Sequence, residues 1–165
     1  MVNQYTVAEF AHVLFGMMWV GVSIYIELVL APMLKKAEKV GDLLRLLPIM
    51  GKTSLFQMLS GLLVLATGAV YLLLLFPLDV VLTISSGQLV VVGLVLVLVA
   101  LINGMVFLKP VAGKLIETKW PEDPNAPIPE SVVRLRATIL AGSVVNTVIV
   151  VVVLFLMVAA ANGGL

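Results

Sequence analysis

The sequence predicts an all-α membrane protein, a single domain over residues 1–165 folded as a four-helix antiparallel transmembrane bundle. Two observations lead to this class. Hydrophobic residues make up 62% of the 165 residues, and charged residues only 12%. The apolar residues also gather in four long runs, each of which exceeds the roughly 20 residues that a helix needs to cross a bilayer core.

The runs cover about residues 7–34, 48–76, 85–108 and 131–161. Each is long enough to cross a membrane with some tilt. Prolines stand near the ends of the first three runs, where the missing N–H of proline costs least. These are Pro32, Pro48, Pro77 and Pro110. We therefore expect them to mark helix boundaries.

The positive charges predict the orientation of the bundle. All ten Lys and Arg residues lie in or beside two connections, at residues 35–52 and 109–136. By the positive-inside rule, both connections face the cytoplasm and both termini lie outside. We expect an integral protein of a prokaryotic plasma membrane, with the lipid bilayer as its first partner. No cleaved signal peptide is expected, because no basic residue precedes the first apolar run.

Several classes of protein are excluded by composition. The chain has no cysteine, which excludes disulfides, iron–sulfur clusters and covalently attached haem. Its net charge of +1 argues against a nucleic-acid partner. The first connection could form a short interfacial helix. The proline-rich segment 119–131 is predicted to be an extended surface linker.

Polar residues of the first run share one stripe. At 100° per residue, Glu9, His12, Gly16, Trp19, Ser23 and Glu27 fall within a narrow arc. The other three runs show similar polar or small faces, which include Gln57, Thr67, Gln88, Asn103, Arg136, Asn146 and Met157. We expect these faces to point into the bundle, away from lipid.

The inner part of this interior contains Glu27. Arg136 is the best-placed cation, and a Glu27–Arg136 ion pair tied to Gln57 and Asn103 could lock the bundle. Asn146 is expected near the middle. The alternative is a proton or ion pathway along Glu27 and Asn146.

The outer part contains His12, the only histidine in the chain. Neutral imidazole is a common haem ligand, Gly16 would leave room for the porphyrin, and Trp19 could pack on its edge. Met157 is a candidate second ligand. A packed structural histidine, copper binding and proton chemistry are the alternatives.

The chain resembles the HemJ-type protoporphyrinogen oxidase and CopD-like group of small membrane proteins. The features that carry the resemblance are His12, Trp19-x-Gly21, Pro32, a basic linker with Arg45, Thr67-Gly68, and Arg134 with Arg136. The resemblance implies a four-helix core, b-type haem on His12, and either porphyrinogen oxidation or copper handling. Gln88 stands where HemJ-like proteins carry Lys, and it joins the cofactor-binding candidates. Asn146 follows Arg136 later than the family's Asn-Glu does.

The leading prediction is an integral membrane protein that binds haem b through His12, with Gly16, Trp19, Gln88 and Met157 around it. It would act in electron transfer or in oxidation of a small substrate near the outer face. A redox partner or quinone would exchange electrons with it, and a homo-oligomer is possible. The alternatives are a copper or proton/ion transporter and a non-catalytic subunit of a larger membrane complex. No catalytic residue is assigned.

Overall fold

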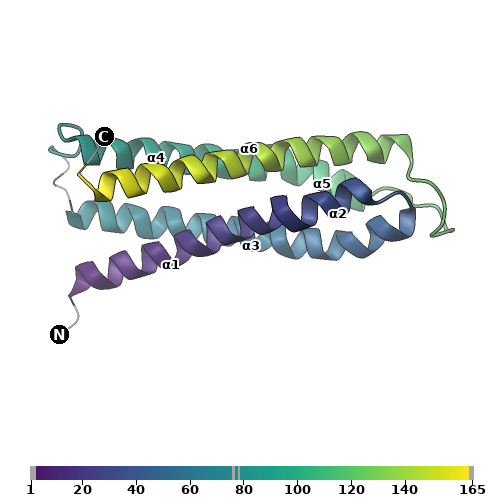
Figure 1. Ribbon diagram of the computed structural model, residues 1–165, viewed down its shortest axis with the longest axis horizontal. Helices are drawn as coiled ribbons and strands as arrows, with labels where there is room; N and C mark the ends of the chain where they lie inside the picture. The colour runs from purple at the N-terminus through teal and green to yellow at the C-terminus, as the bar shows by residue number, and fades with distance from the viewer. Residues whose placement is uncertain (1–2, 76, 78, 164–165) are drawn as a thin grey trace.

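The computed structural model describes residues 3–75, 77 and 79–163. This part of the chain contains four helical stretches that are long and apolar enough to cross a membrane. They are Gln4–Lys36, Val40–Leu75, Ser85–Ile116 and Glu130–Ala161. Figure 1 shows them side by side, with the first turn of α1 and the last turn of α6 at the same end of the molecule. No β-strand occurs within the described ranges.

Two of the four stretches are interrupted. The first consists of α1 (Gln4–Tyr25), a π-helical segment η1 (Ile26–Leu30) and α2 (Ala31–Lys36). The second is α3 (Val40–Leu75). The third consists of α4 (Ser85–Ile102), a π-helical segment η2 (Asn103–Leu108) and α5 (Lys109–Ile116). The fourth is α6 (Glu130–Ala161).

The second stretch begins earlier than predicted. We expected a separate interfacial helix followed by a boundary at Pro48, whereas α3 starts at Val40 and contains Pro48 in its interior. Both expectations are wrong. The missing proline N–H leaves the Leu44 carbonyl without its helical donor. Leu44 and Pro48 are exposed, so water or lipid headgroups can take the donor's place. Phe76, the predicted last residue, lies outside the described residues.

Pro32 also lies within a continuous helical stretch. Segment η1 ends just before it, and the Ala31 N–H donates to Ile26 O, five residues back. A π-turn of this kind adds a residue to the turn and relaxes the helix at a position where proline offers no donor. The chain therefore passes Pro32 and stays helical as far as Lys36.

The third stretch repeats this arrangement. Segment η2 precedes Pro110, and the Lys109 N–H donates to Gly104 O. The helix then runs to Ile116 rather than to the predicted Leu108. Neither proline marks a helix boundary, because the π-turn accommodates it.

Helices α1 and α3 pack closely along their length. Their contacts pair His12 with Gly68, Trp19 with Gly61, and Ser23 with Gln57. Residue numbers thus rise along one helix as they fall along the other. Trp19, only 3% exposed, is the largest side chain in the apolar cluster of this half of the bundle. A second apolar cluster, which includes Leu43 and Val132, fills the other half.

The proline-rich connection before α6 is anchored to the bundle. The backbone N–H groups of Val40 and Gly41 donate to Ala126 O (3.1 Å) and Pro124 O (2.8 Å). These amides belong to the first turn of α3, where a helix has no internal acceptors for them. The predicted surface linker therefore also caps a helix.

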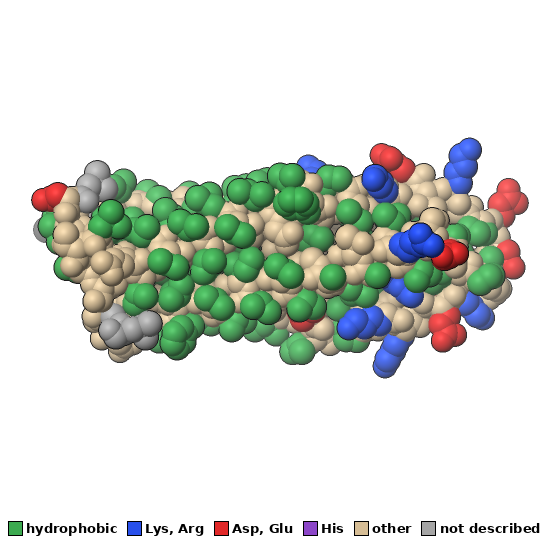
Figure 2. All heavy atoms as spheres, turned by 90° about the horizontal axis from the view of Figure 1, so that it is seen from above, with side chains coloured by type: hydrophobic (Ala, Val, Ile, Leu, Met, Phe, Trp, Pro, Cys, Tyr) green, Lys and Arg blue, Asp and Glu red, His purple; other side chains and the backbone are tan. Residues whose placement is uncertain are grey.

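Side-chain charge is concentrated at the end of the bundle that carries this connection. Figure 2 shows Lys and Arg side chains gathered there, while apolar side chains are spread over the rest of the visible surface. Helix α3 has 36 residues and is about 54 Å long, against about 30 Å for a bilayer core. We call the charged end the basic end and the opposite end the far end.

Candidate functional site

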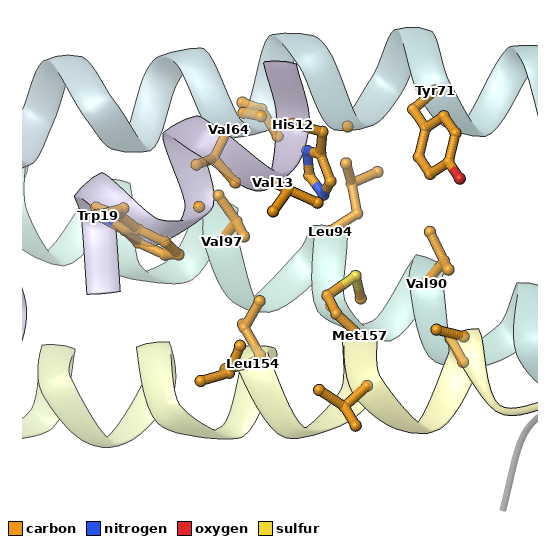
Figure 3. Close-up of a pocket in the computed structure, with 18 of the residues that line it drawn as sticks. His12, Val13, Trp19, Val64, Tyr71, Val90, Leu94, Val97, Leu154 and Met157 are labelled. Atoms are coloured by element: carbon orange, nitrogen blue, oxygen red, sulfur yellow. The ribbon is translucent and has the colours of Figure 1, made fainter. Parts of the chain in front are cut away.

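A cavity of about 650 Å³ lies between the four helical stretches in the half near the far end. We call it the outer cavity. Its lining is mainly aliphatic and includes Glu9, His12, Gly16, Trp19, Tyr71 and Met157. Figure 3 shows side chains from α1, α3, α4 and α6 around it. The volume falls in the range of about 300–1,000 Å³ that is usual for small-molecule and cofactor sites.

The orientation of His12 is set by α3. His12 Nδ1 lies 3.4 Å from Thr67 Oγ1, and the Thr67 hydroxyl donates to Leu63 O at 2.6 Å. Because the single hydroxyl hydrogen is used in that bond, the hydroxyl accepts from Nδ1–H. In its neutral form the imidazole then carries its hydrogen on Nδ1 and keeps a lone pair on Nε2. A free Nε2 with a hydrogen-bonded Nδ1–H is the usual arrangement of a metal-ligating histidine.

Glycines allow side chains to lie close to the helices around the outer cavity. A β-carbon on Gly68 would lie 2.8 Å from His12 Cε1, and one on Gly93 would lie 2.4 Å from Met157 Cε. Figure 3 shows His12 and Met157 pointing into the cavity from different helices. Gly68 and Gly93 were not among the predicted site residues. The sequence signal for Gly68 was the Thr67-Gly68 pair on the inward face of its helix. Nothing in the sequence singles out Gly93.

Of the other three residues predicted to bind the cofactor, two line the outer cavity and one does not. Gly16 lines the cavity, and no atom lies within 4 Å of a β-carbon placed there. Trp19 also lines the cavity and packs on Gly61. Gln88, in contrast, is exposed, lies outside the lining and donates from Nε2 to Leu82 O at 2.8 Å. The structure thus brings His12, Gly16, Trp19 and Met157 together and leaves Gln88 apart.

The outer cavity has little charge. Among the described residues that line it, Glu9 is the only charged one and none is Lys or Arg. Tyr71 lies near His12, with 6.2 Å between the ring centroids. Within the described residues, no three His, Cys, Asp or Glu side chains gather as a metal-binding group. A metal bound here would therefore depend on His12 and on ligands of other kinds.

The predicted Glu27–Arg136 ion pair is not formed. Arg136 Nη1 donates instead to Leu34 O (3.0 Å) and Ala37 O (2.7 Å), the carbonyls at the end of the first helical stretch. Glu27 Oε1 is buried without a hydrogen-bond partner. The α2 carbonyls have no donors of their own, so a guanidinium can cap them without the desolvation that a fully buried ion pair requires.

The other polar residues predicted around Glu27, in the half near the basic end, form two separate pairs. Gln57 Nε2 donates to Ser23 Oγ at 2.7 Å. Asn103 Nδ2 donates to Asn146 Oδ1 at 2.9 Å. The predicted single network around Glu27 is thus replaced by one pair between α1 and α3 and another between η2 and α6.

No protein-family model, curated protein or solved structure matches the chain. The resemblance to the HemJ-type and CopD-like group stays a prediction. Any function assigned to the outer cavity therefore rests on the residues that line it.

Proposed function

We propose that the chain is an integral membrane protein that binds b-type haem in the outer cavity, with His12 as the axial ligand. It would act in electron transfer or in oxidation of a small substrate, such as a porphyrinogen, near the outer face. One observation carries the proposal: His12 lines a cavity of about 650 Å³ while Thr67 holds its Nδ1 and leaves Nε2 free.

The lining suits a flat apolar cofactor. Gly16 leaves open space on one side of the cavity, and Trp19 offers an aromatic face at its inner boundary. Met157 is the candidate for a second ligand, since a thioether is a known partner of histidine on haem iron. When bound, haem would supply an iron centre that takes up and releases single electrons.

The haem carboxylates have no cation in this lining. Because Glu9 is the only charged residue in the described lining, the carboxylates need water or headgroups at the far end of the bundle. This requirement favours a haem that sits close to the membrane surface, and it favours chemistry near that surface.

The proposed orientation places the four stretches across a prokaryotic plasma membrane as an antiparallel bundle, with the basic end inside and both termini outside. The gathering of Lys and Arg at one end supports it. The chain contains no cysteine, so single cysteines can report on sidedness. In intact cells, a membrane-impermeant maleimide should label Thr83→Cys and spare Glu122→Cys. The reverse pattern would invert the orientation.

The test of haem binding is optical. Protein purified from haem-replete cells should show a Soret band, and His12→Ala should lose it while eluting as a folded protein on gel filtration. Gln88→Ala serves as the control, because Gln88 lies outside the cavity lining, and it should keep the band. Colourless wild-type protein from such cells would overturn the proposal.

A further inference from the structure

A second cavity of about 420 Å³ lies between the four stretches in the half near the basic end. We call it the inner cavity. Its lining is again mainly aliphatic, with Gln57, Ser143, Asn146 and Thr147 among the polar members. Trp19 lines both cavities and so forms part of the boundary between them. Nothing in the proposed haem site uses this second space.

Both π-helical segments border the inner cavity. Ile26 and Leu30 of η1 line it, as do Met105 and Leu108 of η2. Such segments are rare and occur often at functional sites. The two that precede Pro32 and Pro110 border one cavity, so the backbone around it departs from α-helical hydrogen bonding on two stretches of the chain.

The π-turn of η2 leaves a backbone acceptor of Met105 without its helical donor. In an α-helix, Met105 O would accept from the Lys109 N–H, but that group donates to Gly104 O. The next amide along the chain belongs to Pro110, which has no hydrogen to donate. Met105 O is therefore left without either helical donor.

Gln57 adds a side-chain acceptor. Its Nε2 donates to Ser23 Oγ (2.7 Å), whose hydroxyl hydrogen is given to Trp19 O (2.9 Å). This chain of bonds fixes which end of the amide carries the hydrogens. Gln57 Oε1 is then left buried with no hydrogen-bond donor. A buried amide oxygen of this kind is complementary to a ligand O–H.

Asn146 supplies a hydrogen-bond donor. Its Oδ1 accepts from Asn103 Nδ2, which fixes the amide and leaves the Nδ2 hydrogens of Asn146 as donors in the wall. The inner cavity thus offers an acceptor on α3 and a donor on α6, within a mainly apolar lining that also includes Lys109. A neutral molecule with an apolar ring and two oxygen functions would satisfy both.

We propose that the inner cavity binds a lipid-soluble quinol. One hydroxyl donates to Gln57 Oε1, the second oxygen accepts from Asn146 Nδ2, and the ring and tail lie among the aliphatic side chains. Binding does not depend on haem in the outer cavity. Only electron exchange between the two sites, across the Trp19 boundary, would rest on the proposed haem function.

The test compares a ligand that carries hydroxyl donors with a methylated ligand that has none, and the Gln57 variant separates the loss of the donor from the added bulk of the methyl groups. Haem-free protein in nanodiscs is titrated under argon with a short-tailed ubiquinol and with its dimethyl ether. Trp120→Phe makes Trp19 the only tryptophan, so a change in fluorescence reports on the cavity boundary. Empty nanodiscs correct for partition into lipid. We expect the quinol to bind about three- to tenfold more tightly than the ether, as one hydrogen bond provides.

The matched variants are Gln57→Met and Gln88→Met. Methionine keeps the unbranched shape of glutamine and removes the amide. Gln57→Met should bring the quinol-to-ether ratio close to one, while Gln88→Met should leave it unchanged. Equal affinities for the two ligands in the wild-type protein, or no fluorescence change with either, would overturn the proposal even if Gln57→Met fails to fold. The protein is haem-free in this experiment, so the Soret test of the outer cavity stands or fails separately.

Discussion

His12 and Gly68 are packed so closely that a β-carbon on Gly68 would lie 2.8 Å from His12 Cε1. The imidazole of α1 lies directly against the backbone of α3, and any side chain at position 68 must move it. The hydroxyl of Thr67, the preceding residue, is hydrogen-bonded to His12 Nδ1. Two adjacent residues of α3 therefore set both the position and the tautomer of the proposed ligand.

Gly68→Ala should displace His12 and lower the haem content of the purified protein. The β-carbon meets a ring atom rather than the flexible end of a long side chain, so the imidazole has to rotate or α1 has to shift. We expect loss of most of the haem, measured as haem per protein after extraction.

Gly51→Ala is the matched control, because Gly51 lies on the same helix and no atom lies within 4 Å of a β-carbon placed there. It should keep the wild-type haem content. Gly68→Ala with an equal haem content would show that His12 does not need its observed position.

The sequence predicts the membrane class well because the length and hydropathy of the apolar runs define it, and it predicts the inward stripe of α1 because helical periodicity defines that. His12, Trp19 and Met157 lie at one cavity for this reason. The Glu27–Arg136 pair failed because a helical wheel gives the face of a residue and not its distance from a partner. Arg136 reaches the Leu34 and Ala37 carbonyls instead, and their lack of donors appears only once the helix end is placed.

The proline positions were misread for a related reason. Proline disfavours a helix interior through its missing N–H, which the sequence shows. Whether a π-turn accommodates it, as η1 does before Pro32 and η2 before Pro110, depends on packing against the neighbouring helices. The unpaired Gln57 Oε1 depends on packing in the same way, because it results from the contact of Gln57 Nε2 with Ser23 on the neighbouring helix.

Thr67→Val should weaken haem binding, while Thr67→Ser should keep it. Valine has nearly the same shape as threonine but leaves His12 Nδ1–H without its acceptor, so the tautomer and ring orientation are no longer fixed. Loss of such an outer partner typically costs about 10–100-fold in metal affinity. Transfer of haem to excess apomyoglobin measures the change. Equal transfer from wild type and both variants would show that the Thr67 contact has no part in binding.

Arg136→Met should destabilise the bundle by about 2–4 kcal/mol, because two carbonyls at the end of α2 lose a charged donor. Unfolding in mixed micelles measures the free energy. Arg134→Met is the control, since Arg134 forms an exposed pair with Glu130, and it should change stability by less than about 1 kcal/mol.

A double-mutant cycle of Arg136→Met with Glu27→Gln tests the missing ion pair directly. The side chains do not form a salt bridge, so their effects should add within about 0.5 kcal/mol. A coupling energy well above that value would show that Glu27 and Arg136 do interact, as the sequence suggested.

Gly41→Val should release the proline-rich connection from the first turn of α3. A β-carbon on Gly41 would lie 3.1 Å from Pro124 O, the atom that accepts the Gly41 N–H. Valine adds two methyl groups at this contact, so the connection has to move away and two helix-capping bonds are weakened together. Trypsin should then cleave after the exposed Lys119 about tenfold faster than in the wild-type protein, as followed by gel electrophoresis of protein in nanodiscs. Gly51→Val, on the same helix with open space at its β-carbon, should leave the cleavage rate unchanged, and equal rates for both variants would mean that the connection is not held by this contact.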